Sequence, residues 1–568
     1  MSGTFNRTDS LRRLAETQFD VLVIGGGVTG CGAALDAASR GLRTALVERD
    51  DFASGTSSKS SKMVHGGLRY LQQGDVRLVY EALAERQRLR KNAPHLVKVL
   101  PFLLPVFGKG GVIPKKLSRA LGSAMWMYDL TGGARIGKLH KRIRPAEALA
   151  HMPTLPAEKL ASSYLYYDAR ADDARLTLTL ARTAAIDHGA VVVNDTNVVN
   201  IVKTPEGKAC GVVVRATDSF GETLQFDVRA RSIVNAAGVW SDEVRTLDEG
   251  TDPDSIRPAK GIHITVPWSK VRNDIAVVVP VRKDKRSIFV VPWGDFTYIG
   301  TTDTDYSGPI DDPQCTAEDI TYLLTAMNEA MTVELTEADI TGTWAGLRPL
   351  VRDAGSEKTA DLSRRHRVAA SKSGVVTVTG GKLTTYREMA ADTIDRVVND
   401  VLGANSVNRG AKRSRTKRLA LRGADGYAQL IASVPTPVAG APEDVVTHLA
   451  NRYGGESNAL LAMIETDPTL GQPLIDGLPY LRAEAIYAVR YEMARTLDDI
   501  LSRRTRARLL GRDATSDAAA TVAALVAIEL GWDDAEQGRQ VSNYQAIIEH
   551  ERTAASLPET LLDAATGA

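Results

Sequence analysis

The sequence predicts an α/β protein that carries a helical C-terminal domain. An apolar run, a glycine-rich turn, an alanine-rich stretch and a second apolar run follow one another between Phe19 and Glu48, in the order strand, turn, helix, strand. Strand-like and helix-like patterns then alternate, with many glycines, as far as Val401. After the basic stretch at residues 412–418, helical periodicity dominates. Because the chain has 568 residues, we expect two or three domains with sizeable cores.

The glycine-rich turn has the spacing of a dinucleotide-binding unit. Gly25 is expected to make the tight turn, Gly27 to let the backbone approach a pyrophosphate, and Gly30 to let helix and strand pack closely. The helix that begins near Thr29 then points its free N–H groups and its positive dipole end at the phosphates. Glu48 ends the next apolar run, where a carboxylate accepts a ribose hydroxyl. The motif predicts an adenine dinucleotide and does not separate NAD from FAD.

A second glycine turn favours a flavin. Residues 374–390 again have the pattern of a strand, a double glycine and the start of a helix. A second helix N-terminus suits a flavin because the reduced ring carries negative charge at its N1–C2=O edge. The segment at residues 231–241 is a short strand that breaks at small residues, where another backbone can approach the cofactor. Together these segments add the cofactor-binding candidates Ala237, Gly238, Gly381, Lys382, Leu383 and Thr384.

The segment at residues 55–71 combines clustered hydroxyl groups with a histidine and an arginine. Such hydroxyls suit a phosphate, although the same composition is typical of an ordinary polar loop. Arg69 and Tyr70 lie at the end of the segment. Its candidates for cofactor contact are Thr56, Ser57, Ser58, Ser60, Ser61, His65, Gly66 and Gly67.

The composition indicates a globular protein without a global attraction to nucleic acid, since it has 43% hydrophobic residues, 24% charged residues and a net charge of +1. Cys31, Cys210 and Cys315 form no paired motif, so neither a disulfide framework nor a zinc site is predicted, and no other metal site is expected. The N-terminus lacks an apolar signal segment, and no run of about 18 apolar residues occurs. We therefore expect a protein that is soluble or lies on a membrane surface.

One segment keeps the membrane surface open as a location. Residues 99–107 are apolar, and basic and aromatic side chains follow them at Lys109, Lys115, Lys116, Arg119, Trp126 and Tyr128. This combination resembles an anchor that enters one leaflet of a bilayer. The alternative is a buried strand followed by a core helix, which periodicity slightly favours.

In the C-terminal region, the spacing predicts a helix over residues 485–501 whose apolar face is formed by Ile486, Val489, Met493, Leu497 and Ile500. Such a stripe is more often a core face than a chemical site. We interpret the region as a helical domain for packing, dimerisation or partner contact.

These motifs resemble those of FAD-dependent glycerol-3-phosphate dehydrogenases. The sequences IGGGVTGCGAALDAASRG at residues 24–41 and GGKLTTYREMA at residues 380–390 are similar to signature segments of that family. Five more segments resemble segments of that family and occur in the same order along the chain, at residues 60–71, 260–263, 344–350, 363–366 and 498–506. The resemblance implies FAD and an FAD-binding Rossmann-like domain of the glutathione-reductase or D-amino-acid-oxidase type. It also implies an interleaved mixed-sheet substrate domain and an all-α C-terminal domain.

On this basis, we expect a flexible N-terminus at residues 1–17 and an FAD-binding domain at residues 18–403. Substrate-binding or cap segments would be interleaved in that domain at roughly 76–160 and 255–345. A basic linker is expected at residues 404–420 and the helical domain at residues 421–568.

The resemblance implies an activity as well. In that family, a flavin takes hydride from C2 of sn-glycerol 3-phosphate, giving dihydroxyacetone phosphate, and then reduces a membrane quinone. A phosphate dianion needs fixed cations, and guanidinium groups suit it through paired hydrogen bonds. The substrate-binding candidates are Arg69, Tyr70, Arg348, Arg364 and Lys382.

The reaction also needs a base and positive charge near the flavin. Removal of the C2 hydroxyl proton requires a group with a pKa near neutral, which indicates histidine, and both His263 and His65 are candidates. Lys382 or Arg348 could stabilise the reduced flavin at its N1–C2=O edge. The sequence does not choose between the two histidines.

Two other functions remain open. A non-catalytic redox sensor would bind nucleic acid through residues 412–418, but it would leave His65, Arg69, Arg348 and Lys382 without a role. An oxidase of the same fold would use oxygen or act on an amine. An amine does not call for several arginines, so a phosphate substrate is favoured, whereas oxygen and quinone are not separated.

The C-terminal region contains no calcium-loop motif, which favours a bacterial-type enzyme over a calcium-regulated one. We expect a cytoplasmic homodimer that is peripherally attached to the inner face of the cell membrane and does not bind nucleic acid.

Overall fold

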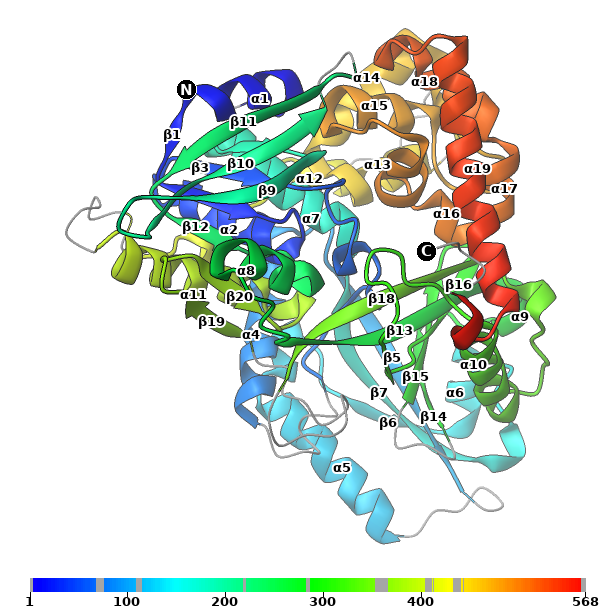
Figure 1. Cartoon of the computed structure of the whole chain (residues 1–568). Helices are drawn as coiled ribbons and strands as arrows, with labels where there is room; N and C mark the ends of the chain where they lie inside the picture. The colour runs from blue at the N-terminus through cyan, green and yellow to red at the C-terminus, as the bar shows by residue number, and fades with distance from the viewer. Residues whose placement is uncertain are drawn as a thin grey trace.

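The computed structural model describes residues 4–67, 76–108, 115–217, 221–281, 287–352, 366–403, 411, 413–432, 441–442 and 444–562, without the side chains of residues 115–121 and 133–134. Figure 1 shows two packed sheets and their helices in one half of the molecule and a larger sheet in the other half. The C-terminal helices, in orange and red, lie beside both halves.

The first sheet contains the strand that precedes the glycine turn. Among the described residues it has six strands, in the order β19 (Arg367–Ala370), β20 (Val376–Thr379), β12 (Ile233–Asn235), β2 (Val21–Ile24), β3 (Thr44–Val47) and β8 (Val191–Val193). Neighbouring strands are parallel except β19 and β20. Every residue of β2, β3, β8 and β12 is buried, as expected for parallel strands that are covered on both faces.

The side chains of β2 alternate between the two faces of the first sheet, and each face packs in a different core. Val21 and Val23 pack in one core with helices α2 (Val28–Ser39), α7 (Asp173–Arg182) and α11 (Tyr386–Arg396). Leu22 and Ile24 point to the opposite face, because successive side chains of a strand alternate. There they meet a second sheet, in the order β1 (Gln18–Phe19), β11 (Thr223–Ala230), β10 (Ala209–Thr217) and β9 (Thr196–Lys203). The result is a three-layer α/β domain.

The third sheet has ten strands among the described residues. Its main order is β17 (Thr304–Asp305), β13 (Ile256–Pro267), β16 (Phe296–Gly300), β15 (Ser287–Trp293), β14 (Ala276–Pro280), β5 (Lys98–Phe107), β7 (Leu160–Arg170) and β4 (Met63–Val64). In addition, β18 (Gly342–Val351) pairs with β13, and β6 (Lys141–Ile143) pairs with β7. The sheet therefore joins stretches of chain that are far apart in sequence.

Helices cover both faces of this third sheet. Residues of α6 (Pro145–His151) and α10 (Ala317–Ala330) share a core with Ile262 and Ile264 of β13. Residues of α4 (Val76–Asn92) and α5 (Lys115–Leu130) share a core with Trp344 of β18 on the other face. A short helix, α9 (Trp268–Val271), follows β13. Residues 99–107 form most of β5 and Tyr128 of α5 is buried, as expected for a strand and a core helix, whereas Trp126 of the same helix is 54% exposed.

The C-terminal region is helical. Its helices are α12 (Tyr427–Ala432), α13 (Val445–Tyr453), α14 (Ser457–Thr466), α15 (Arg482–Glu492), α16 (Ala507–Leu510), α17 (Arg512–Asp517), α18 (Ala519–Leu530) and α19 (Asp534–Ser556). Figure 1 shows α19 running from this domain toward the third sheet, where it contacts α10.

The predicted helix over residues 485–501 is wrong in its length. Helix α15 ends at Glu492, and Met493 has a left-handed backbone with φ of 54°. The carbonyl of Glu492 accepts two hydrogen bonds from the guanidinium of Arg504, and the carbonyl of Met493 accepts one from Asn194. Because these carbonyls accept hydrogen bonds from side chains, the backbone hydrogen bonds of the helix do not continue past Glu492.

Two connecting segments also differ from expectation. Residues 1–17 were expected to be flexible, but Arg7–Glu16 form helix α1, which is capped by Asn6 and buries Leu11 and Leu14. Residues 404–420 were expected to be a linker, but Thr416 donates to the buried carboxylate of Asp36 in α2 at 3.1 Å. The described parts of both segments thus pack on the three-layer domain, through contacts between residues that are distant in sequence.

Candidate active site

A cavity of about 400 Å³ lies between the three-layer domain and the third sheet. It is located at the carboxyl ends of β2, β12 and β20, where ligands bind in open α/β sheets. Its walls include both glycine turns, residues 54–65, helix α8 (Ser241–Glu249), and parts of β13 and β18. Segments that are separated by more than 300 residues in sequence therefore meet at one site.

The first glycine turn has the geometry that the sequence predicts. Gly25 has a φ of 108°, a region that favours glycine, and a Cβ there would lie 2.7 Å from the carbonyl oxygen of Ala236. A Cβ on Gly30 would lie 1.9 Å from the carbonyl oxygen of Gly25. Gly27 and Thr29 line the cavity at the start of α2, where Val28 donates its N–H to Ser57 Oγ at 2.8 Å. The backbone can therefore approach a ligand closely at this helix N-terminus.

Glu48 lies at the end of β3 and faces the same cavity. Its Oε2 accepts the N–H of Gly26, and its Oε1 accepts the N–H of Asp50 at 2.8 Å. Burial raises the pKa of Glu48 to about 7, although these two N–H groups act in the opposite direction. The carboxyl group is held in place as a hydrogen-bond acceptor.

The second glycine turn follows β20. Gly380 and Gly381 have φ values of 74° and 83°, and a Cβ on Gly381 would lie 2.3 Å from Met389 Sδ. Gly381, Lys382, Leu383 and Thr384 line the cavity at the start of a short helix that continues into α11. Thr384 Oγ1 accepts the backbone N–H of His65 at 3.1 Å, which joins this turn to the segment after the serines.

His263 reaches the cavity from the middle of the third sheet. It lies on β13 opposite Trp344 of β18, and the two rings stack with centroids 4.7 Å apart. Nε2 is 2.8 Å from Ser61 Oγ, whereas the buried Nδ1 has no hydrogen-bond partner among the described residues. Burial, together with the positive charges of Lys62 and Arg348, lowers the pKa of His263 well below its usual value. The imidazole is therefore neutral at physiological pH.

His65 is the second histidine at the cavity wall. Its ring meets the ring of Phe289 edge-to-face, with centroids 6.4 Å apart. The structure thus brings both candidate bases to one site.

Arg348 lies on the same side of β18 as Trp344 and Gly346, because side chains two residues apart share a face. Its Nη1 donates to Asp303 Oδ1 at 3.0 Å, and its Nη2 donates to the carbonyl of Thr302 at 3.1 Å. The guanidinium is 24% exposed, while Asp303 is 5% exposed. Arg348 is therefore a fixed cation at the cavity whose charge is shared with a buried carboxylate.

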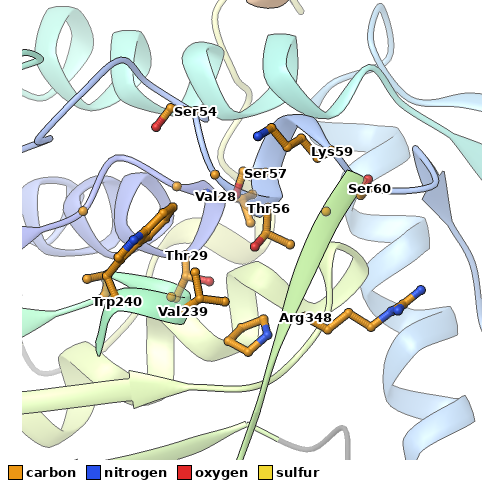
Figure 2. A pocket seen from close by; sticks show the side chains of 18 of the residues that line it. Val28, Thr29, Ser54, Thr56, Ser57, Lys59, Ser60, Val239, Trp240 and Arg348 are labelled. Carbon is orange, nitrogen blue, oxygen red and sulfur yellow. Dashed lines mark hydrogen bonds between the residues drawn. The ribbon is translucent and has the colours of Figure 1, made fainter. Parts of the chain in front are cut away.

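Residues 56–61, which we call the serine loop, pass along the cavity wall. Figure 2 shows Thr56 and Ser57 of this loop beside Val28, with Arg348 on a neighbouring strand. Thr56 donates to the carbonyl of Leu347 at 2.6 Å, and Ser60 donates to Asp173 at 2.7 Å. The loop hydroxyls are thus largely engaged by protein groups. Among the cofactor candidates, Thr56, Ser57, Ser60 and Ser61 line the cavity and Ser58 does not.

Other predicted site residues are placed as follows. Ala237 and Gly238 line the cavity after β12. Gly66 and Gly67 do not line it, and the N–H of Gly66 instead donates to the hydroxyl of Tyr128 at 3.3 Å. Arg69, Tyr70 and Arg364 lie outside the described residues.

Sequence reasoning missed several cavity residues. They include Arg49, Lys59, Trp240, Phe289 and Thr301. Trp240 closely follows the turn at Ala237 and could have been found from that motif, whereas Phe289 and Thr301 carry no recognisable signal. Thr301, in the connection between β16 and β17, accepts a hydrogen bond from Arg348 through its hydroxyl at 3.3 Å, a contact between residues that are distant in sequence.

Among the described residues, no three or more His, Cys, Asp and Glu side chains gather as ligands of a metal ion. Within the same residue ranges, no helix is both long and apolar enough to span a bilayer.

Two family models match the chain. The model described as FAD dependent oxidoreductase matches residues 20–387, and the model described as C-terminal domain of alpha-glycerophosphate oxidase matches residues 414–537. The first of these covers most of the described cavity residues, including both glycine turns.

Individual relatives match over nearly the whole chain. Glycerol-3-phosphate dehydrogenase 2 of Mycobacterium tuberculosis is 42% identical over 560 residues, which are 98% of this chain and 92% of the relative. The mitochondrial glycerol-3-phosphate dehydrogenase of Homo sapiens is 37% identical and covers 96% of this chain and 75% of the relative. The solved structure of the glycerol-3-phosphate dehydrogenase from Bacillus halodurans, complexed with FAD, has a TM-score of 0.74 and 31% identity, covering 98% of this chain and 99% of that one. The cavity, its two glycine turns and these matches together place the chain in the family of FAD-dependent glycerol-3-phosphate dehydrogenases.

Proposed function

We propose that this enzyme oxidises sn-glycerol 3-phosphate at C2 to dihydroxyacetone phosphate and passes the two electrons to a membrane quinone. The observation that carries the proposal is the meeting of both glycine turns with His263, His65, Arg348 and Lys382 in one cavity. The names of the relatives support the same substrate.

The residues of the cavity fit FAD. The turn at Gly25 and Gly27 and the start of α2 line the cavity and suit the pyrophosphate, while Glu48 suits a ribose hydroxyl. The turn at Gly381 and Lys382 suits the pyrimidine edge of the flavin, where positive charge favours the reduced ring. When bound, FAD supplies a two-electron acceptor for the hydride of C2.

The chain's own residues have three tasks in this proposal. Arg348 and Lys382 hold the phosphate dianion or the developing negative charge, because both are cations that line the cavity and Arg348 is held in place by Asp303. A histidine removes the C2 hydroxyl proton as hydride leaves the same carbon. His263 is neutral and can accept a proton, but its lowered pKa makes it a weaker base than an ordinary histidine, and His65 is the alternative base at the same wall.

The test is anaerobic reduction of the purified enzyme. Glycerol 3-phosphate should bleach the visible absorbance of the flavin, and dihydroxyacetone phosphate should appear in equal amount. Reoxidation is then followed separately with oxygen and with a soluble quinone analogue. Rapid reoxidation by oxygen alone would indicate an oxidase, while failure of any substrate to bleach the flavin would favour the redox sensor and refute the proposal.

We further propose that the enzyme lies on the inner face of the cell membrane as a homodimer. Helix α5 and the segment that follows it expose Trp126, Met127, Leu130 and Leu139, which suits contact with a membrane surface. Liposome sedimentation tests the first part, because Trp126→Ser together with Leu130→Ser should release the protein into the supernatant. Sedimentation equilibrium tests the second part, and a monomer at micromolar concentration would contradict it.

A further inference from the structure

We propose that Arg506, in the helical domain, is a positioning residue for the active site and acts by fixing the serine loop. The proposal gives the C-terminal domain a task in binding and catalysis. It rests on the proposed function only where the reaction itself is measured.

Arg506 is buried at the boundary between the helical domain and the FAD-binding domain. Its side chain is 1% exposed, and its backbone has a left-handed φ of 74° just before α16. Nη1 donates to the carbonyl of Ser502 at 3.0 Å, which anchors the guanidinium in its own domain. Nη2 crosses the boundary and donates to the carbonyl of Ser58 and to Asp173 Oδ1, the latter at 3.0 Å.

Asp173 links this guanidinium to the rest of the serine loop. Its carboxylate is fully buried at the start of α7 and accepts the N–H of Ser60 at 3.0 Å and the hydroxyl of Ser60 at 2.7 Å. Lys62 donates to the same carboxylate at 3.2 Å and to the carbonyl of Ser58 at 3.1 Å. Arg506 and Lys62 therefore hold the same two acceptors, so the middle of the loop is fixed from both sides.

The two ends of the serine loop contact the proposed cofactor and substrate machinery. At one end, Ser57 Oγ accepts the N–H of Val28 at the start of α2. At the other end, Ser61 Oγ lies 2.8 Å from His263 Nε2. Between them, the carbonyl of Ser60 accepts the indole N–H of Trp344 at 3.2 Å, and this indole stacks on His263. A displacement of the loop would reach the pyrophosphate site and the candidate base together.

Burial makes this link rigid. Asp173 and the guanidinium of Arg506 are both shielded from solvent, so loss of the cation would leave a buried carboxylate with less compensation. The loop would then have to move toward water or toward Lys62. Groups that orient contacting residues in this way typically change affinity or activity by about 10- to 100-fold when they are removed.

The boundary offers a matched control in Arg182. This buried arginine of α7 binds Glu456 of the helical domain and donates to the carbonyl of Tyr491, but it contacts no residue of the serine loop. Arg506→Met and Arg182→Met each remove one buried guanidinium between the same two domains. Only the first variant removes a contact to the loop.

The experiment compares the full-length variants by two readouts besides thermal stability. The first is the dissociation constant of FAD from apoprotein, measured by flavin fluorescence. The second is the rate of flavin reduction at saturating glycerol 3-phosphate, measured by stopped flow on fully loaded enzyme. We expect Arg506→Met to weaken FAD binding by about 10-fold and to slow reduction by about 10- to 100-fold, whereas Arg182→Met lowers the melting temperature and leaves both readouts within about twofold.

Equal effects of the two variants, or an effect of Arg506→Met on melting temperature alone, would overturn the proposal. If Arg506→Met does not fold, Arg506→Lys takes its place, because it keeps the buried charge but its single amine cannot donate to Ser502 on one side and to Ser58 and Asp173 on the other, as the two Nη groups do. If glycerol 3-phosphate does not reduce the wild-type flavin, the proposed function fails, and the FAD dissociation constants still decide this inference.

Discussion

Replacing Arg348 with methionine should lower kcat/KM for glycerol 3-phosphate by roughly 10³-fold, and part of this loss should come from Asp303. The guanidinium is a cation at the cavity wall, and its loss removes a charge-assisted contact to the phosphate that is worth about 1.5 to 3 kcal/mol. It also leaves the Asp303 carboxylate, which is 5% exposed, without the cation 3.0 Å away. That carboxylate would then repel the dianionic substrate and add about 1 to 2 kcal/mol.

A double-mutant cycle separates these two contributions. Asp303→Asn added to Arg348→Met should restore kcat/KM by roughly tenfold, because it removes a negative charge close to the substrate without restoring the contact. The assay is stopped-flow reduction of the flavin over a range of glycerol 3-phosphate concentrations, with FAD affinity and melting temperature recorded for each variant. Arg257→Met is the matched control, since Arg257 pairs with Asp305 at the edge of the same sheet and does not line the cavity. The reasoning is refuted if the double variant is no faster than Arg348→Met.

Three other changes test the site. If His263 is the base, His263→Asn should slow flavin reduction by about 10²- to 10⁴-fold while His65→Asn spares it. Because burial and two cations lower the pKa of His263, the decline of wild-type kcat/KM below pH 7 should follow only the second ionisation of the substrate phosphate, at about 6. An additional enzyme group that titrates near about 6.5 would exclude this assignment. Gly30→Ala should abolish FAD binding, measured as flavin content, because the added Cβ would lie 1.9 Å from the carbonyl oxygen of Gly25. Gly538→Ala is the control and should leave the flavin content unchanged, because the space around Gly538 is open. Glu48→Gln should weaken FAD binding by about tenfold or more in calorimetry. In the wild type, FAD binding should strengthen as pH rises through about 7, where Glu48 becomes ionised, and Glu48→Gln should lack this dependence.

The parts of the fold that local sequence determines could be predicted. The strand β2, the glycine turn, α2 and β3 follow from an apolar run, three spaced glycines and a second apolar run, all within 30 residues of one another. The second glycine turn was recognisable for the same reason. Its position opposite the first turn follows from parallel pairing of β12 with both β2 and β20.

The parts that depend on distant partners could not be predicted. Helix α15 ends where Arg504 and Asn194 take backbone carbonyls, and neither partner is adjacent in sequence. Arg348 was recognisable as a cavity cation from its motif. Its partner Asp303 lies in the connection between β16 and β17, and the sequence around Asp303 contains no recognisable motif. The choice between two histidines likewise depends on burial, which a single sequence does not contain.

The order in which the cavity walls are synthesised has a consequence for assembly of the enzyme. The first glycine turn follows β2 near the start of the chain, whereas the second follows β20, which ends at Thr379. Between them, the chain adds β3, β8, β12 and β19 to the first sheet and forms the described strands of the other two sheets, apart from β1. Because N-terminal segments emerge first from the ribosome, a nascent chain that ends before Val376 has only one of the two turns. Flavin loading is therefore expected late in biogenesis, and the loaded cofactor should join the two ends of this domain and raise its stability by mass action.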